Sequence, residues 1–121
     1  MRLFALRGAT SVDANEASAI LQGTSALISE LMARNELTAE SLVSCIFTLT
    51  HDLDAEFPAL AARRLGLDST PLLCAQEVPV PGSLPRIVRV MVHYYAAEDH
   101  SPQHVYLGAA RALRADLGAA Q

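Results

Sequence analysis

The sequence predicts an α/β fold, built as an α+β sandwich in which a mixed β-sheet carries two helices on one face. Four segments have the alternating or continuous apolar pattern of strands, and two segments repeat apolar residues at helical spacing. Their order is β-α-β-α-β-β, which is typical of helices packed on a mixed sheet. The 121 residues, 51% of them hydrophobic, are expected to form a single domain, 1–121.

The first strand and the first helix have the clearest local patterns. Residues 2–9 alternate between two faces, as expected for a strand with one side on the core. The two faces are Leu3, Ala5 and Arg7 on one side and Phe4, Leu6 and Gly8 on the other. Apolar residues then recur at helical spacing over 17–35, and Asp13 followed by Glu16 predicts a capping box at the start of this helix.

The remaining elements follow at regular intervals. They are a second strand at 43–52, a second helix at 53–67, a third strand at 70–80 and a fourth strand at 86–97. Phe57 and Pro58 are expected at the start of the second helix and Gly66 at its end. The last segment, from 101, predicts a loop and then one or two helical turns or a short strand, with a mobile tail at about 112–121.

The fourth strand is the longest apolar β-segment, and it is apolar on both of its sides. Two helices are enough to cover only one face of a four-stranded sheet. The other face of the sheet is therefore predicted to meet another subunit, so that the protein forms an oligomer.

The charge pattern excludes some partners. The net charge of −4 argues against a general attraction to nucleic acid or to membrane phosphates. No segment approaches the roughly 18 apolar residues of a membrane span. Arg7 interrupts the apolar N-terminus, which argues against a signal peptide and for a cytoplasmic location. All nine basic residues are arginines, which suit bidentate carboxylate recognition, although nucleotide composition explains this bias equally well.

Arg89 is the most informative residue because it lies between two valines of the fourth strand. An unpaired charge in the interior is costly, so Arg89 requires a carboxylate partner or a wet cleft. Two interpretations remain open: a structural ion pair with Glu77 on the neighbouring strand, or a cation held for an anionic ligand. Arg7 is expected to end the first strand beside Gly8, where the backbone allows a ligand to approach closely.

Glu77 and Cys74 lie near the end of the third strand. Glu77 is either a solvated carboxylate at the edge, or a group that accepts a ligand hydrogen bond or acts as a base. Strand alternation places Cys74 on the opposite face, so both meet one ligand only if the strand end twists or bulges. We expect Cys74 to be a packing or hydrogen-bonding residue rather than a nucleophile, since no Cys/His motif accompanies it. The spacings of the cysteines and histidines do not predict a metal site.

Four segments together resemble the monofunctional AroH-type chorismate mutases. They are "LRGATSVDAN", "TLTHDLDAEFPALAARRLG", "PLLCAQEVPVPGSLPRIVRVMVH" and "HVYLGAARALRADL", which follow in order and span nearly the whole chain. The resemblance implies an isomerase of aromatic amino-acid (Phe/Tyr) biosynthesis that converts chorismate to prephenate by a Claisen rearrangement, without cofactor or metal. It also implies a homotrimer, a pseudo-α/β barrel with active sites in clefts between subunits.

The resemblance further implies which residues form the site. Arg89, Glu77 and Arg7 are the implied catalytic residues. Arg89 would face the ether oxygen on which negative charge grows, Glu77 would bind the ring hydroxyl, and Arg7 with Tyr106 would hold a carboxylate. The implied substrate-binding residues are Arg7, Phe57, Ala59, Arg63, Leu73, Cys74, Glu77, Arg89, Tyr106 and Arg114. Phe57, Ala59 and Arg63 match the wall supplied by the adjacent subunit, and Arg114 matches the arginine of the mobile tail.

Two departures from the family pattern keep alternatives open. Leu60 stands where some members have a lysine, and Ala115 replaces the proline usual after the tail arginine. One alternative is therefore a non-catalytic trimer that binds a small dicarboxylate through the same arginines. Another is a cysteine hydrolase that acts through Cys74.

Overall fold

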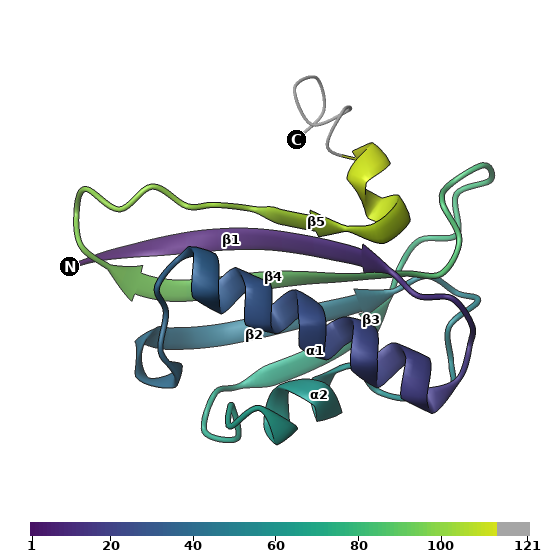
Figure 1. Ribbon diagram of the computed structural model, residues 1–121, viewed down its shortest axis with the longest axis horizontal. Helices are drawn as coiled ribbons and strands as arrows, with labels where there is room; N and C mark the ends of the chain where they lie inside the picture. The colour runs from purple at the N-terminus through teal and green to yellow at the C-terminus, as the bar shows by residue number, and fades with distance from the viewer. Residues whose placement is uncertain (114–121) are drawn as a thin grey trace.

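The computed structural model describes residues 1–113, which contain five strands and two α-helices (Figure 1). The strands are β1 (Arg2–Ser11), β2 (Leu42–Leu49), β3 (Leu72–Gln76), β4 (Ile87–Ala96) and β5 (Val105–Leu107). The helices are α1 (Ala17–Arg34) and α2 (Ala59–Arg64), with 3₁₀ turns at Ala39–Ser41 and Gly108–Ala110. Neither helix is long and apolar enough to cross a membrane.

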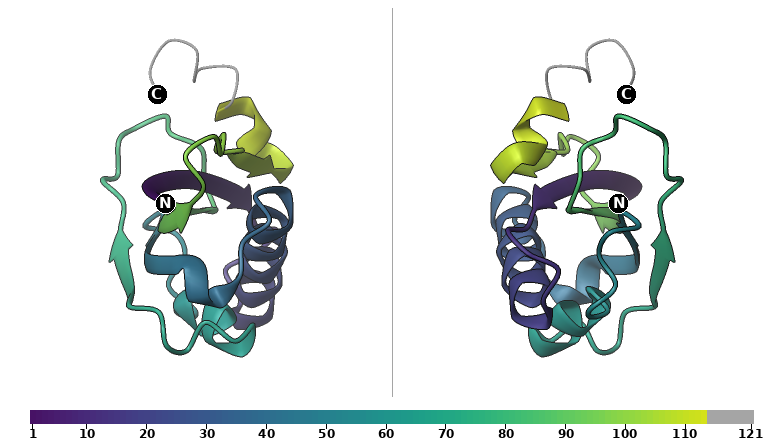
Figure 2. Two further views of the ribbon diagram at one scale, coloured as in Figure 1. Left: turned by 90° about the vertical axis from the view of Figure 1, so that its left-hand side faces the viewer. Right: turned by 90° about the vertical axis from the view of Figure 1, so that its right-hand side faces the viewer.

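The strands form one mixed sheet in the order β3-β2-β4-β1-β5. β4 pairs antiparallel with β1 and β2, whereas the edge strands pair parallel, β3 with β2 and β5 with β1. α1 and α2 contact each other on the same face of the sheet (Figure 2). The predicted mixed sheet with two helices on one face is confirmed, and the sheet gains an additional edge strand, β5, from the segment whose structure the sequence left open.

The second helix is shorter than predicted. It covers Ala59–Arg64 and not 53–67, because the residue before a proline is disfavoured in the helical region and Pro58 therefore sets the start. Gly66, with a φ of +95°, ends the helix as predicted. The third strand is also shorter than predicted, ending at Gln76, since the prolines that follow have no N–H to donate to a neighbouring strand.

The predicted capping box at the start of α1 is wrong. The N-cap residue is Glu16, which has extended backbone angles and no side-chain hydrogen bond to the helix. The side chain of Asn15 instead holds the loop before α2, accepting hydrogen bonds of 3.0 Å from the backbone N–H groups of Asp54 and Ala55. This long-range contact fixes the segment before α1 as a bend, so the helix begins only at Ala17.

Of the two predicted faces of β1, the one with Phe4 and Leu6 packs against α1, and both residues belong to the main core. Gly8 belongs to the same face. A Cβ atom at this position would lie 2.8 Å from the Cδ1 atom of Leu31, so α1 requires a glycine there. Gly8 therefore makes room for the helix, and its backbone also lines the cavity described below. β1 continues past Arg7 to Ser11.

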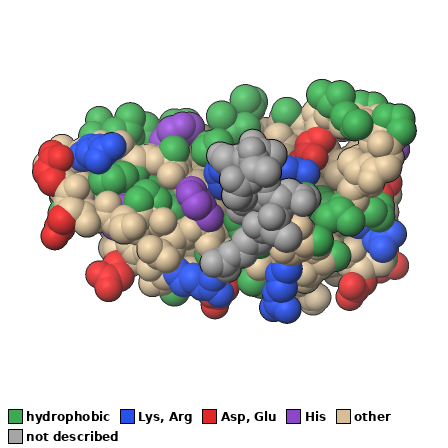
Figure 3. All heavy atoms as spheres, turned by 90° about the horizontal axis from the view of Figure 1, so that it is seen from above, with side chains coloured by type: hydrophobic (Ala, Val, Ile, Leu, Met, Phe, Trp, Pro, Cys, Tyr) green, Lys and Arg blue, Asp and Glu red, His purple; other side chains and the backbone are tan. Residues whose placement is uncertain are grey.

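Neither α1 nor α2 lies on the other face of the sheet, which we call the open face. The 3₁₀ turn Gly108–Ala110 covers one end of it, where Ala110 packs with Ala9 and Ile87. β4 is only partly apolar on this face, since Met91 and Tyr95 alternate with Arg89 and His93. Exposed apolar side chains of the other strands continue the surface, namely Leu3, Ile46 and Leu73. Figure 3 shows further apolar side chains gathered at the end of the molecule that the loop between β3 and β4 forms.

We predict that Thr24→Val raises the melting temperature. Thr24 is fully buried on α1, and its hydroxyl has no hydrogen-bond partner among residues 1–113. Valine has the same shape and branching, so the change removes an unsatisfied polar group at a gain of about 1 kcal/mol. Thermal unfolding measures the shift. Thr24→Ser, which keeps the hydroxyl and loses the methyl group, is the control and is expected to lower the melting temperature; a Val variant that also melts lower would contradict the assignment.

Candidate active site

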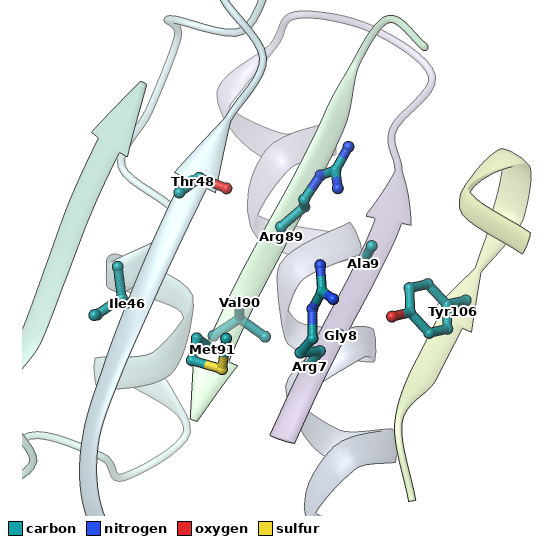
Figure 4. Close-up of a pocket in the computed structure, with 9 residues that line it drawn as sticks. All are labelled: Arg7, Gly8, Ala9, Ile46, Thr48, Arg89, Val90, Met91 and Tyr106. Carbon is teal, nitrogen blue, oxygen red and sulfur yellow. The ribbon is translucent and has the colours of Figure 1, made fainter. Parts of the chain in front are cut away.

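A cavity of about 170 Å³ opens on the open face where four strands run side by side (Figure 4). It is lined by Arg7, Gly8, Ala9, Ile46, Thr48, Arg89, Val90, Met91 and Tyr106. β1, β2, β4 and β5 each contribute to this lining, so the cavity depends on the sheet order and not on one local motif. We call it the arginine cavity.

Strand register brings the two arginines together. In the antiparallel pairing of β1 with β4, Ala9 lies opposite Arg89 and Arg7 lies opposite Met91. Arg7 and Arg89 are therefore diagonal neighbours on the same face, and both guanidinium groups project into the cavity (Figure 4). Two like charges at this spacing repel each other, so the cavity is suited to an anion that meets both.

Arg89 forms an ion pair with Glu77, as one of the two interpretations predicted. Its Nε atom lies 3.1 Å from the Oε2 atom of Glu77, and the two side chains are 34% and 17% exposed. The Nε–H group is not aligned for a hydrogen bond with any atom of residues 1–113. The pair therefore leaves the terminal nitrogens of Arg89 available, and no hydrogen bond within the described residues engages them.

Glu77 does not lie on the strand next to β4, contrary to the prediction. β2 stands between β3 and β4, and Thr48 of β2 is the residue opposite Arg89. Glu77 follows the end of β3 and is held there by its backbone N–H, which donates a hydrogen bond of 2.8 Å to the carbonyl of Leu49. The carboxylate reaches across β2 to Arg89, and the hydroxyl of Thr48 donates to its Oε2 atom at 2.6 Å.

Tyr106 of β5 contributes a hydroxyl group to the arginine cavity. It lies opposite Ala9 in the parallel pairing of β5 with β1, and its ring points across β1 toward the arginines (Figure 4). Its hydroxyl is buried and has no hydrogen-bond partner among residues 1–113. A buried hydroxyl left unsatisfied costs about 1–3 kcal/mol, so a ligand group that bonds to it would recover this energy.

The segment before β5 is fastened to the rest of the domain by side chains to which the sequence assigned no role. The Asn35 amide accepts a hydrogen bond of 2.7 Å from the backbone N–H of Gln103 and donates one of 3.0 Å to its carbonyl. The hydroxyl of Tyr94 lies 2.8 Å from Nε2 of His100. His104 accepts a hydrogen bond of 3.0 Å at Nδ1 from the backbone N–H of Arg7. These contacts hold β5, and thus Tyr106, beside β1.

His104 makes the stability of this region depend on pH. Burial, and then the positive charge of Arg7, hold the pKa of His104 below its ordinary value of 6.5. The unfolded chain therefore binds a proton at a higher pH than the folded chain does, and stability is lost as the pH falls through about 6.5. We predict that the denaturant midpoint decreases more steeply between pH 7.5 and 5.5 in the wild type than in His104→Gln. Equal slopes in the two proteins would contradict this assignment.

A second cavity of about 270 Å³ lies beside α2 at the β3 edge, and we call it the α2 cavity. It is lined by Phe57, Ala59, Arg63, Leu72, Leu73 and Cys74. Within one chain the predicted site residues thus fall into two groups. Arg7, Arg89 and Tyr106 line the arginine cavity, whereas the residues just named line the α2 cavity. Cys74 and Glu77 do not meet, as strand alternation indicated. Arg114 and Ala115 lie outside the described residues, so the prediction for Arg114 is not tested.

The chemistry of the two cavities favours binding over covalent catalysis. No histidine lines the α2 cavity with Cys74, and burial raises the pKa of the other thiol, Cys45, to about 11. Within residues 1–113 no cluster of His, Cys, Asp or Glu is able to hold a metal ion. The arginine cavity offers two guanidinium groups, a tyrosine hydroxyl and, close by, one carboxylate. This set recognises a small molecule with several oxygens, most of them anionic.

The fold and the arginine cavity thus define a small α+β protein whose open face carries a cavity suited to an anionic metabolite. The family model for chorismate mutase type I matches residues 3–117. Chorismate mutase AroH of Thermus thermophilus is 45% identical over 121 residues, covering 96% of this chain and 97% of that protein. Chorismate mutase AroH of Bacillus subtilis (strain 168) is 37% identical over 122 residues, covering 97% and 94%.

Comparison with solved structures gives the same result. The structure of a chorismate mutase from Clostridium thermocellum matches with a TM-score of 0.88 and 45% sequence identity, covering 90% of this chain and 98% of that chain. The chain belongs to the chorismate mutase type I family, and its activity is that of a chorismate mutase, an isomerase. The resemblance that the four sequence segments carry is confirmed over almost the full length.

Proposed function

We propose that the protein rearranges chorismate to prephenate by electrostatic and conformational stabilisation, at sites formed between the subunits of a homotrimer. The observation that carries this proposal is the pair of guanidinium groups on the open face, for which residues 1–113 supply one ion-pair partner, the carboxylate of Glu77. Chorismate is a dianion, so it supplies the negative charge that the cavity lacks. The reaction is intramolecular and requires no nucleophile, and the lining residues of this cavity include no cysteine, serine or histidine.

Arg89 has the central role in this mechanism. As the C–O bond of chorismate breaks and the new C–C bond forms, electron density grows on the ether oxygen. A guanidinium fixed near that oxygen stabilises the transition state more than the ground state, and so raises the turnover number. The buried valines on both sides of Arg89 hold its backbone in a rigid central strand, so the charge does not need to reorganise during the reaction.

The other residues hold chorismate in its reactive conformation. Arg7 and Tyr106 bind a carboxylate, and Tyr106 thereby gains a partner for its buried hydroxyl. Glu77 accepts a hydrogen bond from the ring hydroxyl. Fixing both ends of the molecule places the enolpyruvyl arm over the ring, which removes much of the entropic cost of reaching the transition state.

Trimer formation would unite the two groups of site residues. Phe57 and Leu73 are 68% and 61% exposed, although large apolar side chains of this kind are normally covered. Leu73 lies on the edge strand β3 and Phe57 lines the α2 cavity beside it, and unpaired strand edges favour association. In the proposed trimer, Phe57, Ala59 and Arg63 of one subunit form a wall of the arginine cavity of the next, and Leu73, Cys74 and Arg114 complete the substrate-binding residues.

We predict that Arg89→Ala reduces the turnover number by roughly 10²–10³-fold, the effect typical of losing one preorganised charge donor. The disappearance of chorismate, followed by its absorbance, measures this directly. Arg34→Ala is a matched control, because Arg34 pairs with Glu30 on the exposed surface of α1. Near wild-type turnover in the Arg89 variant would remove this residue from the mechanism. Tight binding of chorismate without rearrangement in the wild type would favour the non-catalytic dicarboxylate binder.

We predict that two inactive variants complement each other in mixed oligomers. Arg89→Ala damages the arginine cavity and Arg63→Ala damages the α2 cavity. When the two chains are co-expressed with different tags and purified as mixed trimers, some sites combine an intact Arg89 with an intact Arg63, and activity returns. Sizing of the same sample establishes the trimer. Mixed trimers that remain as inactive as the separate variants would contradict a site shared between subunits.

A further inference from the structure

Thr48 is the one polar residue of the arginine cavity that the sequence did not single out. It lies on β2, directly opposite Arg89 and on the same open face. Its hydroxyl donates a hydrogen bond of 2.6 Å to Oε2 of Glu77, the same oxygen that lies 3.1 Å from Nε of Arg89. Thr48 is thus the side chain that connects the carboxylate to β2, the strand that lies between Glu77 and Arg89. Figure 4 shows Thr48 and Arg89 on their neighbouring strands.

The two carboxylate oxygens of Glu77 have different environments. Oε2 meets both Thr48 and Arg89, whereas Oε1 accepts no hydrogen bond from residues 1–113. The last torsion of a glutamate side chain is broad, so a carboxylate held at one oxygen by one partner rotates easily. Two partners on Oε2 restrict this rotation and leave Oε1 directed away from them, free to accept a hydrogen bond from a ligand.

Arg89 and Glu77 have a stronger alternative geometry for the same ion pair. An arginine and a carboxylate prefer a bidentate pair with two parallel N–H···O bonds, which is shorter and stronger than the contact observed here. In that geometry Oε1 would bond to a terminal nitrogen of Arg89, and the guanidinium would be largely neutralised. The observed contact involves only Nε, and its N–H is not aligned for a hydrogen bond. The bond from Thr48 occupies Oε2 and opposes the rotation that a bidentate pair requires.

We infer that Thr48 is a positioning residue for the rearrangement: its hydroxyl holds Glu77 so that Oε1 is available to the ring hydroxyl and Arg89 remains available to the ether oxygen. This inference rests on the proposed function. Thr48 does not touch the reacting atoms in this account, and it acts only through Glu77. It follows that the effect of Thr48 on kcat/KM disappears when the carboxylate of Glu77 is removed.

Thr48→Val tests the inference with little risk to folding. Valine has the shape of threonine and a high strand propensity, so the change removes one hydroxyl from a half-buried strand position. We expect kcat/KM to fall roughly ten- to a hundred-fold, as for the loss of a hydrogen bond to a charged group, with most of the loss in kcat because Arg89 becomes paired. Thr48→Ser restores the hydroxyl and is expected to recover most of the activity.

Two further measurements separate positioning from a structural role. In a double-mutant cycle, Thr48→Val is expected to have no additional effect on kcat/KM in a Glu77→Ala background, because the two residues act as a unit. Ser44→Ala is the matched control: Ser44 lies on the same face of β2, but its hydroxyl lies 3.2 Å from Nδ1 of His93. It is expected to leave kcat/KM unchanged. Additive losses in the cycle, or wild-type kinetics in Thr48→Val, would overturn the inference.

The failure of this inference is distinguishable from the failure of the proposed function. If the wild type does not accelerate the rearrangement of chorismate, the proposed function fails, whatever Thr48 does. A crystal structure of Thr48→Val then still tests the geometry without turnover. We expect the carboxylate of Glu77 to rotate into a bidentate pair with Arg89. A carboxylate that stays in its present position without the hydroxyl would show that Thr48 does not hold it.

Discussion

The open face of this sheet depends on keeping two arginines close together without neutralising them. The register of β1 against β4 makes Arg7 and Arg89 diagonal neighbours, and their repulsion lowers the stability of the empty protein. Glu77 offsets part of this repulsion through Oε2. The offset is incomplete because the contact is a single, poorly aligned one. Incomplete neutralisation leaves the positive charge that the proposed dianionic substrate requires.

Several features far from the cavity serve to hold this arrangement. Gly8 allows α1 to approach β1, and the packed helix keeps the central strands rigid. The amide of Asn35, at the end of α1, fastens the segment before β5, so that Tyr106 reaches the cavity. The same segment is hydrogen-bonded to β1, because His104 accepts a hydrogen bond from the backbone N–H of Arg7. The catalytic geometry is thus a property of the whole sheet and of the helix behind it.

The sequence predicted the features that arise from local patterns or from the cost of burying charge. Strand alternation gave the two faces of β1, and the isolated charge of Arg89 led to two interpretations, of which one was the pairing with Glu77. Features set by distant contacts were missed or left open. The Asn15 side chain replaced the expected capping box with a bend, and β5 exists because β1 offers an edge to a three-residue segment. No single-sequence pattern encodes either contact.

The role of Thr48 was missed for a similar reason. Threonine is common in strands, so its presence in β2 carried no signal. Only the sheet order, with β2 between β3 and β4, shows that it separates Arg89 from Glu77. The assignment of Cys74 and Glu77 to opposite faces was correct from alternation alone, and the structure places Cys74 in the α2 cavity.

The central claim is that the Arg89 guanidinium is held to meet negative charge on the ether oxygen as the C–O bond breaks. A crystal structure of the protein with a bicyclic ether dicarboxylate, shaped like the strained geometry between chorismate and prephenate, tests it most directly. The account predicts a terminal nitrogen of Arg89 within hydrogen-bond distance of the bridging ether oxygen. A guanidinium turned away from that oxygen and bonded only to Glu77 would contradict it.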